Sequence, residues 1–429
     1  MDTGSVGAKA VVGVGNVRWR LPFVLLVSVL IGYFDRLNIS LALPQIAKEY
    51  GWTVAETGEY GGLLLSIFFV GYGLANIFLS PLGEKYGPRR SLITVVVLFS
   101  LFTALGAPAA AAFSAFIATR FLLGLGEGIH FPMMNALTRN WFPASERSRA
   151  NGTWAAGVMM STILASVLLV PVISAFGWRT MFVLLGIMGM LITVPLLWFF
   201  CYNTPREHPS ITEAEIKFIE AGMEEEETLE RLSFWGQLKL FLSKKAYWLA
   251  LLGGTLNNMV AFGLIMWLPT YFTEGRGLDF SDLQFAVSLP YVASIAGIAL
   301  FAWLGDRTQR RALLTSVGFV IAGTAAYAAA TAPPVVLTSA IFSIGILAQS
   351  SYTANEFAII QRIVPRQRVA TGAGLYNGLA MMIGGGLGPV IVGSIVAATG
   401  SYTSGILTLV GLAFVNAIVL FTLNRVLKY

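Results

Sequence analysis

The chain has 429 residues, of which 56% are hydrophobic and only 12% are charged, and its mean hydropathy is +0.73. A soluble globular protein carries about 25% charged residues, so this composition excludes an ordinary soluble domain and favours an integral membrane protein. The single cysteine and two histidines exclude a disulfide framework and argue against a metal site. The net charge of +6 does not indicate a nucleic-acid partner, because the basic residues lie in short loops between apolar runs.

Apolar runs long enough to cross a bilayer as helices, about 20 residues each, recur along the whole chain. We predict a tail at 1–18, a bundle at 19–202, a linker at 203–245, a second bundle at 246–425 and a tail at 426–429. The fold class is an all-α membrane protein with twelve transmembrane helices in two pseudo-symmetric six-helix bundles. The predicted spans are 20–47, 57–81, 91–111, 113–138, 150–176, 180–202, 246–272, 283–304, 312–331, 335–360, 370–398 and 403–424.

Lysine and arginine are distributed unevenly between the two sides of these spans. With the N-terminus inside, 23 of the 28 lie in the inner segments. The outer loops carry only Lys48, Arg179 and Arg276, and the remaining two, Arg36 and Arg120, are within spans. By the positive-inside rule, both termini and the linker are cytoplasmic. We predict a multi-pass protein of the bacterial inner membrane.

An internal repeat with an offset of 222 residues supports two related halves. The loop LGEKYGPRR after the second span resembles LGDRTQRR after the eighth, which aligns Glu84 with Asp306. The loop WFPASERSRANG after the fourth span resembles IVPRQRVATGAG after the tenth, which aligns Pro143 with Pro365. Two pairs of loops at one offset indicate duplicated six-helix halves related by an axis along the membrane normal.

The loops after the second and eighth spans resemble the signature of the major facilitator superfamily, with Glu84-Lys85 in place of the usual Asp-Arg and Gln309 where a glycine is usual. The segments YFDRLNISLALPQI, RFLLGLGEGIHFP, WFPASERSRA and NTPREHPSITEAEIKFI are similar to the anion:cation symporter family. That family includes bacterial galactonate and hexuronate transporters and, more distantly, vesicular glutamate transporters and sialin. The resemblance covers the full chain and implies the major facilitator fold and alternating access.

Five charged residues fall within predicted spans: Asp35, Arg36, Arg120, Glu127 and Glu356. A charged side chain at the centre of a transmembrane helix costs a few kcal/mol of free energy, so each of these residues is expected to have a structural partner or a function. Ion pairs that hold helices together are one explanation. A functional site is the explanation we favour, because four of the five lie in the first and fourth spans, which line the central cavity in the superfamily that the chain resembles.

Spacing assigns roles to these groups. Arg120 and Glu127 are seven residues apart, on one helix face but about 10 Å from each other along the axis, which is too far for a direct pair. Arg120 is therefore expected to act with an anion or with Asp35, and Glu127 with a proton. Tyr33 and Arg36 share a face at i, i+3, and a guanidinium binds a carboxylate as a bidentate fork. The resemblance implies the same division, with protonation at Asp35 and Glu127 and anion binding and coupling at Arg36 and Arg120.

The repeat places neutral amides opposite these charges. Asp35 and Arg36 map to Asn257 and Asn258, and Glu127 maps to Gln349. We therefore expect the N-terminal half to bind protons and the substrate carboxylate, and the C-terminal half to hydrogen-bond the rest of the substrate. The further substrate-binding candidates are Tyr72, Tyr376 and Asn377, and the candidates for gating at the inner side are Glu84, Arg89, Arg90, Asp306, Arg307 and Glu356. Glu356 is expected to pair with Arg307 or Arg362.

These features predict a proton-coupled symporter that takes up a small organic anion, such as a hexuronate or an aldonate, with protons as the coupling ion and no cofactor or metal. The fifth span lacks the Gly-Pro pair that is common in antiporters of the superfamily, which favours symport. Other carboxylates, uniport, anion exchange and a non-transporting membrane sensor stay open. A membrane enzyme is not expected, since no nucleophile–base set is visible. The expected partners are the anion, protons and the bilayer, and a monomer suffices.

Overall fold

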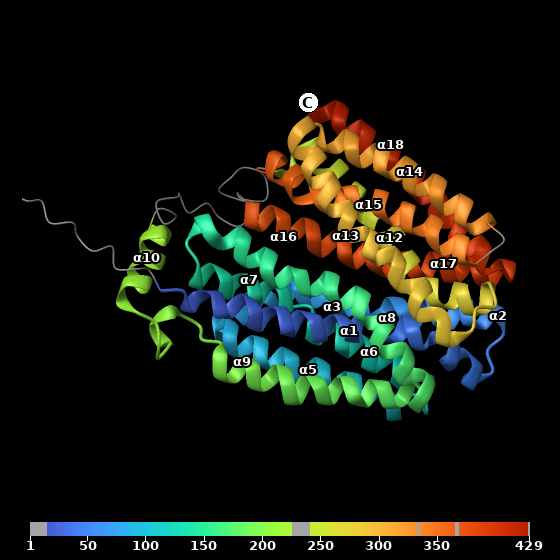
Figure 1. Cartoon of the computed structure of the whole chain (residues 1–429), viewed down its shortest axis with the longest axis horizontal. Coiled ribbons are helices and arrows are strands. Elements are labelled where there is room, and N and C mark those ends of the chain that lie inside the picture. The colour runs from blue at the N-terminus through green and yellow to red at the C-terminus, as the bar shows by residue number, and fades with distance from the viewer. Residues whose placement is uncertain (1–14, 225–240, 333–334, 365–368, 428–429) are drawn as a thin grey trace, which may run out of the picture.

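The computed structural model describes residues 15–224, 241–332, 335–364 and 369–427, and the regular elements in these ranges are helices. Figure 1 shows an N-terminal bundle, blue to green, lying beside a C-terminal bundle, yellow to red. The N-terminal half contains α1 (Arg20–Tyr50), α2 (Val54–Glu56), α3 (Gly62–Phe78), α4 (Ser80–Tyr86), α5 (Pro88–Ala109), α6 (Phe113–Glu127), α7 (His130–Trp141), α8 (Ala144–Met188), α9 (Val194–Phe200) and α10 (Glu213–Glu224). The C-terminal half contains α12 (Lys245–Thr270), α13 (Leu283–Thr308), α14 (Arg311–Thr331), α15 (Val335–Ile363), α16 (Val369–Ala380), α17 (Gly386–Thr399) and α18 (Tyr402–Leu427).

The helices account for the twelve predicted spans. Ten helical stretches in the described residues are long and apolar enough to cross a bilayer. One of them, Ser145–Phe200, has 56 residues and contains two crossings that reverse direction at Gly177, where φ is 81°. The fourth predicted span is divided into α6 and α7 by a turn at residues 128–129, so neither part reaches the length of a span alone. The all-α, twelve-helix fold class is confirmed.

The surface of the bundles is apolar over much of its area. Large hydrophobic side chains that are more than half exposed include Phe78, Phe176, Leu191, Trp198 and Phe199. A soluble monomer seldom exposes contiguous apolar patches of this kind, because their contact with water favours association. In a bilayer the same side chains contact lipid. The chain is a multi-pass integral membrane protein.

The two ends of the bundle differ in the segments they carry. We call the end with Arg20, α10 and Leu427 the linker face, and the end with Tyr50 and Thr399 the opposite face. In Figure 1, α10 lies at the left and the C-terminal end at the top. Near the opposite face, the Ser40 hydroxyl of α1 donates to the carbonyls of Ile265 (3.0 Å) and Met266 (2.9 Å) on α12. These bonds join the two halves directly.

The halves also touch through glycines at the opposite face. A Cβ added to Gly58 would lie 2.5 Å from the carbonyl oxygen of Gly393 and 2.6 Å from the nitrogen of Ala397. Only glycine permits this backbone approach. Toward the linker face, Gly152 on α8 and its repeat equivalent Gly374 on α16 both have open space around them. The halves are therefore closed together at the opposite face, while these two linker-face positions are uncrowded.

Replacing Gly58 by leucine should prevent this closure, since the new side chain would collide with the α17 backbone. We expect Gly58→Leu to block transport and to raise the labelling of a reporter thiol, Ser40→Cys, by an impermeant maleimide added from the opposite face. The background is Cys201→Ala, which removes the single native thiol. Gly152→Leu, which meets no neighbour, is the matched control and should leave the labelling unchanged. Equal labelling of the Gly58 and Gly152 variants would show that this contact does not control closure.

The repeat also explains the unusual residue Gln309. Gln309 has φ 58° and is the one non-glycine residue with positive φ in the described chain, and its equivalent in the first half is Gly87, with φ 95°. Both positions end the helix before the basic part of the loop. The second loop thus keeps a positive φ at this position although the glycine is missing.

Gln309→Gly should stabilise the protein. Left-handed backbone costs about 1–2 kcal/mol for a residue with a Cβ, and the extra entropy of glycine in the unfolded chain offsets about 0.4–1 kcal/mol of the gain. We expect a small rise in the thermal midpoint of the detergent-purified protein. The reciprocal change, Gly87→Gln, should lower it, and a fall with Gln309→Gly would contradict the strain account.

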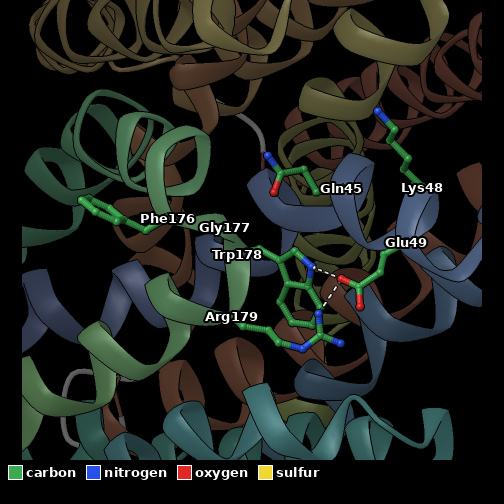
Figure 2. Close-up of a pocket in the computed structure, with 7 residues that line it drawn as sticks. All are labelled: Gln45, Lys48, Glu49, Phe176, Gly177, Trp178 and Arg179. Atoms are coloured by element: carbon green, nitrogen blue, oxygen red, sulfur yellow. Dashed lines mark hydrogen bonds and ion pairs between the residues drawn. The ribbon is translucent and has the colours of Figure 1, made fainter.

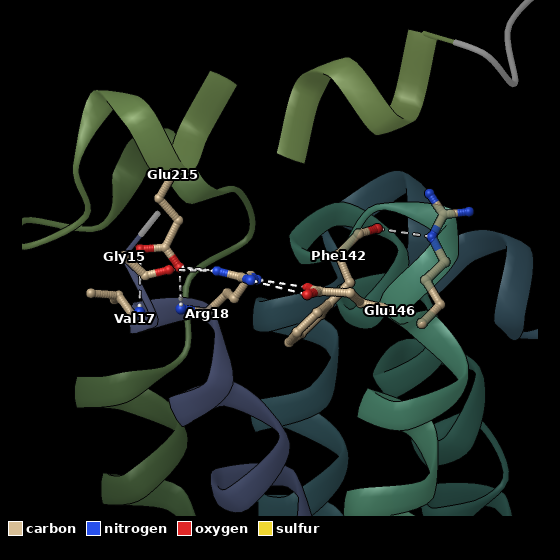
Figure 3. Close-up of polar contacts among 7 residues, drawn as sticks. Gly15, Val17, Arg18, Phe142, Glu146 and Glu215 are labelled. Carbon is tan, nitrogen blue, oxygen red and sulfur yellow. Dashed lines mark hydrogen bonds and ion pairs between the residues drawn. The ribbon is translucent and has the colours of Figure 1, made fainter. Parts of the chain in front are cut away.

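Part of the predicted linker packs on the linker face through a buried ion-pair network (Figure 3). Arg18 pairs with Glu146 at the start of α8 (2.8 Å) and with Glu215 of α10 (2.9 Å). Glu215 also accepts from the backbone nitrogens of Val17 (3.2 Å) and Arg18 (3.0 Å), and it is fully buried. The network ties the segment before α1, the start of α8 and helix α10 together.

Glu215→Gln should destabilise the protein, because it removes a charge that satisfies buried donors from two residues. Leaving a buried donor unsatisfied costs about 1–3 kcal/mol, so we expect a clearly lower thermal midpoint. Glu220→Gln on the same helix is the matched control, since Glu220 pairs with Arg206 in an exposed ion pair. Similar midpoints for the two variants would mean that burial adds nothing to the Glu215 contacts.

Candidate functional site

The buried charges of the N-terminal half meet where α1 contacts α6 and α3. Arg36 Nη2 lies 2.7 Å from Glu127 Oε1, and each side chain is 1% exposed. A second guanidinium nitrogen of Arg36 donates to the Tyr33 hydroxyl at 3.1 Å. The guanidinium carbon lies 4.3 Å, 5.2 Å and 4.8 Å from the ring centroids of Tyr33, Phe68 and Tyr72 respectively. The charge is therefore held by one carboxylate and three aromatic faces, a geometry suited to a planar guanidinium.

Arg120 forms a second, looser site beside the first. Its Nη1 donates to the backbone carbonyl of Asp35 and to Asn38 Oδ1, both at 3.3 Å, and its side chain is 2% exposed. The sequence predicts that Arg120 acts with an anion or with Asp35. In the structure Arg120 does contact Asp35, but it bonds to the backbone carbonyl and not to the carboxylate. Asn38 was not predicted. Its position three residues after Asp35, on the same helix face, was the available signal.

Several polar atoms of this cluster have no hydrogen-bond partner among the described residues. They include both carboxyl oxygens of Asp35, the Nε atoms of Arg36 and Arg120, and Glu127 Oε2. The hydroxyl of Thr103 on α5 lies near Asp35 but outside hydrogen-bonding geometry. A buried ionised carboxylate without a partner costs several kcal/mol, whereas a neutral acid costs much less. The buried carboxyl group of Asp35 is therefore less costly when it is neutral, and the two arginines keep Nε donors that no described residue accepts.

The amides of the C-terminal half form a chain at the equivalent positions. Gln349 Nε2 lies 3.4 Å from Asn257 Oδ1, and Asn257 Nδ2 lies 3.3 Å from Asn258 Oδ1. The repeat thus replaces the charged groups with neutral ones, but Gln349 bonds to Asn257, the equivalent of Asp35, rather than to Asn258, the equivalent of Arg36. Asn258 and Gln349 are partly exposed, and each keeps donors and acceptors for a hydroxylated ligand.

The structure separates the remaining substrate-binding candidates. Tyr72 is 2% exposed and belongs to the aromatic cage around Arg36. Tyr376 is fully buried, and its hydroxyl bonds to Glu356 Oε1 at 2.8 Å and to the Tyr352 hydroxyl at 2.7 Å. Asn377 is partly exposed. Tyr376 is therefore bonded within its own half rather than to the amide chain.

The gating candidates bond within their own halves. Asp306 pairs with Arg311 at 2.5 Å, and Arg307 lies over the ring of Trp303. The expected pairing of Glu356 with Arg307 or Arg362 is wrong, because its carboxylate accepts instead from Tyr376. The physical reason is the close approach of α16 to α15, which brings a phenol rather than a guanidinium to the acid.

The other gating candidates lie in the first repeat. The backbone nitrogen of Arg89 donates to Asn203 Oδ1 at 2.9 Å, and its guanidinium donates to the carbonyl of Trp198 at 2.5 Å. Glu84 and Arg90 are exposed. The gating roles stay predictions.

A pocket of about 630 Å³ opens at the opposite face, away from the buried charges (Figure 2). Glu49 accepts there from Trp178 Nε1 (3.0 Å) and from Arg179 (2.5 Å). Gln45, also in its lining, is nine residues beyond Arg36 on α1, or about 14 Å along the axis. The pocket is therefore separate from the candidate site. Its lining residues are Gln45, Lys48, Glu49, Phe176, Gly177, Trp178 and Arg179.

Comparison with known proteins gives the family. The model of the Major Facilitator Superfamily matches residues 25–389. The chain belongs to this superfamily. Among solved structures, it is similar to a bacterial homologue of the human lysosomal transporter Spinster in its inward-facing, unoccupied conformation, with a TM-score of 0.81 and 19% identity over 97% of this chain and 98% of that one. A D-xylose–proton symporter also matches, with a TM-score of 0.69 and 16% identity over 93% of this chain and 96% of that one. At these identities the likeness shows the fold alone.

Several sequence relatives of this major facilitator protein have the names of anion or sugar-acid transporters. The "Hexuronate transporter" of Bacillus subtilis (strain 168) is 27% identical over 92% of this chain and 92% of its own length. The "Probable galactarate/D-glucarate transporter GudP" of the same organism is 26% identical over 95% of this chain and 92% of its length. The "Ascorbate transporter, chloroplastic" of Arabidopsis thaliana is 29% identical over 71% of this chain, which spans 56% of that protein. The expectation of a transporter rather than an enzyme is confirmed, and these names agree with the resemblance to the anion:cation symporters.

Proposed function

We propose that this major facilitator protein is a proton-coupled symporter that takes up a small organic anion of the sugar-acid class. The observation that carries the proposal is the buried pair of Arg36 and Glu127, with the unbonded carboxyl of Asp35 one residue away. It combines an anion-binding guanidinium with two acids that can exchange protons. The sugar-acid names of the relatives with nearly full coverage support this substrate class.

Glu127 acts as an internal substitute for the substrate carboxylate. Its Oε1 occupies one Nη2 donor of Arg36, and a substrate carboxylate needs the same fork. When Glu127 takes up a proton, it loses its charge and its hold on Arg36, and the substrate carboxylate binds in its place. Binding of the anion and of the proton are thereby linked, because each favours the other at one guanidinium.

Asp35 and Arg120 provide the second proton site. Asp35 Oδ1 and Oδ2 have no partner among the described residues, and Arg120 holds the adjacent backbone carbonyl. Protonation of Asp35 before the halves rearrange avoids carrying an unpaired carboxylate through a dry barrier, which would be costly. Release of both protons restores the Arg36–Glu127 pair and expels the substrate.

The amide chain of the C-terminal half binds the rest of the substrate. Gln349, Asn257 and Asn258 each offer an acceptor and donors, which suits the hydroxyl groups of a hexuronate or aldonate. In this proposal the carboxylate docks in the N-terminal half and the hydroxyls in the C-terminal half. Movement of the halves about the bound substrate then gives alternating access.

The linker face is cytoplasmic in this proposal, and the membrane is the bacterial inner membrane. The excess of lysine and arginine on that side supports the orientation by the positive-inside rule. The Ser40 bonds and the Gly58 contact close the opposite face, so the structure corresponds to a form closed to the outside. A monomer carries all the named groups.

A thermal-shift screen followed by transport tests the proposal. Purified protein is incubated with hexuronates, aldonates, hydroxy acids and aromatic carboxylates at acid and neutral pH, and the stabilising anion is then used in proteoliposomes with and without a proton gradient. We expect stabilisation by a sugar acid and uphill uptake only with the gradient. Stabilisation only by an aromatic or hydroxy acid would change the substrate class, and undiminished uphill uptake without the gradient would refute proton coupling.

A further inference from the structure

A chain of two phenols and one carboxyl group crosses the C-terminal bundle between α12, α15 and α16. The Tyr376 hydroxyl lies 2.8 Å from Glu356 Oε1 and 2.7 Å from the Tyr352 hydroxyl, and the Tyr352 hydroxyl lies 3.4 Å from the carbonyl oxygen of Ala250. With Glu356 ionised, Tyr376 donates to Glu356 and Tyr352 donates to Tyr376. With Glu356 protonated, Glu356 donates to Tyr376, Tyr376 donates to Tyr352, and the Tyr352 hydrogen is free to go to the carbonyl of Ala250. The two bonds among the three side chains are therefore kept in both states, and the protonated state adds the bond to Ala250.

Among the described residues, no cation pairs with Glu356. Within the described residues Glu356 takes part in no ion pair, and the titratable groups that face it are Tyr376 from α16 and Tyr352 from α15. Helix α12 contributes only the carbonyl of Ala250 to the chain. An unpaired carboxylate inside a span is costly and marks a functional position.

Packing does not require an acid at this place. The repeat maps Glu356 onto Met134, whose side chain is fully buried in the N-terminal bundle. The same fold position therefore accepts an unbranched apolar side chain of similar length. We therefore infer that the carboxyl group of Glu356 serves the chemistry of the protein and is not needed for packing.

The chain lies next to the amides that we propose bind the substrate. Tyr352 is three residues after Gln349 on α15, so the two share a helix face. The Tyr376 hydroxyl lies directly against Gly254, three residues before Asn257 on α12. A change of charge at Glu356 therefore acts on two of the helices that hold the amide chain.

The chain is also close to the linker face. Glu356 is seven residues before the end of α15 at Ile363, and Tyr376 is seven residues after the start of α16 at Val369. At 1.5 Å per residue, both are about 10 Å from those helix ends. Glu356 is partly exposed and lies about two helical turns from the linker face, the side on which we place proton release.

We propose that Glu356 is a protonatable group of the C-terminal half, which takes up a proton while the halves are open to the opposite face and releases it at the linker face during each transport cycle. The inference rests on the proposed symport and adds a third acid to Asp35 and Glu127. In the cycle, Glu356 binds a proton from water, Tyr376 turns to donate to Tyr352, and the reverse occurs on release. The proton count per substrate then depends on both halves.

Infrared spectroscopy of the full-length protein in proteoliposomes tests this directly, because protonated carboxyl groups have a distinct C=O band. On titration from neutral to acid pH, we expect a band that is absent in Glu356→Gln and shifted in Tyr376→Phe, which removes the phenol hydrogen bond. Glu356→Met, which introduces the residue found at the equivalent position of the first repeat, shows by its thermal midpoint whether the fold survives loss of the acid. The band should persist in Glu127→Gln. Superimposable titrations of the wild type and Glu356→Gln would overturn the proposal.

A transport assay, together with the infrared band, distinguishes failure of this inference from failure of the proposed symport. The infrared band requires no substrate, so it would remain if symport itself were refuted. With the anion from the thermal-shift screen, Glu356→Gln should move fewer protons per substrate than the wild type, while anion affinity at Arg36 stays within about twofold, or 0.4 kcal/mol. An unchanged proton count would exclude Glu356 from the cycle even if the band were present.

Discussion

Replacing Arg36 by lysine should weaken binding of the substrate anion by about 10- to 100-fold. The guanidinium offers two parallel donors to a carboxylate, and lysine offers a point charge on a flexible stem. Hydrogen bonds to charged groups contribute about 1.5–3 kcal/mol each, and loss of one corresponds to this range of affinity. Lysine also cannot spread its charge over the rings of Tyr33, Phe68 and Tyr72. The measurement is the dissociation constant of the stabilising anion, from calorimetry or a thermal-shift titration.

Lysine is preferred to alanine here because it keeps a cation beside Glu127. Removing one partner of a buried ion pair leaves the other unpaired and destabilises the folded protein by about 3–5 kcal/mol. A loss of anion binding in such a variant could then result from unfolding. Arg179→Lys is the matched control, since Arg179 also pairs with a glutamate but is 41% exposed. Its affinity should equal that of the wild type. If Arg36→Lys bound the anion as tightly as Arg179→Lys, the guanidinium would be structural and the anion site would lie elsewhere.

The spans could be predicted because hydropathy over 20 residues reflects the bilayer, and no tertiary detail enters. The reversal at Gly177 falls in the break predicted between residues 176 and 180. The break between α6 and α7 was not predicted, because it lies inside the single predicted span 113–138. The left-handed Gln309 is a different case, since the repeat with Gly87 pointed to a glycine-like conformation that composition alone would not suggest.

The members of the candidate site could be predicted more readily than their partners. Arg36 and Glu127 can be identified as candidates from sequence alone, because each is a charged residue within a predicted span. Their bond joins residues 91 apart, and it depends on the rotation of α1 against α6, which spacing along one helix does not define. The same limit explains the wrong partner for Glu356. Its bond to Tyr376 follows from the approach of two helices.

Replacing Glu127 by glutamine should uncouple transport from the proton gradient. Glutamine keeps the size and can still accept from Arg36, but it cannot gain or lose a proton. One proton moved down a gradient of one pH unit supplies about 1.4 kcal/mol, which supports about tenfold accumulation of substrate. We expect Glu127→Gln to lose at least this factor of accumulation in proteoliposomes, while exchange of labelled for unlabelled anion at equal pH continues. Anion affinity in this variant should also become less dependent on pH.

Glu49→Gln is the matched control, because Glu49 forms an arginine pair of the same chemistry at the opposite face and is 46% exposed. It should accumulate the anion as the wild type does. Exchange without accumulation in Glu127→Gln alone would place the coupling proton on the carboxyl that competes with substrate for Arg36. Full accumulation in Glu127→Gln would move the coupling to Asp35 or Glu356, and Asp35→Asn in the same assay would then decide between the two halves. If neither single variant lost accumulation, the Arg36–Glu127 pair would hold helices together and would not couple protons to the substrate.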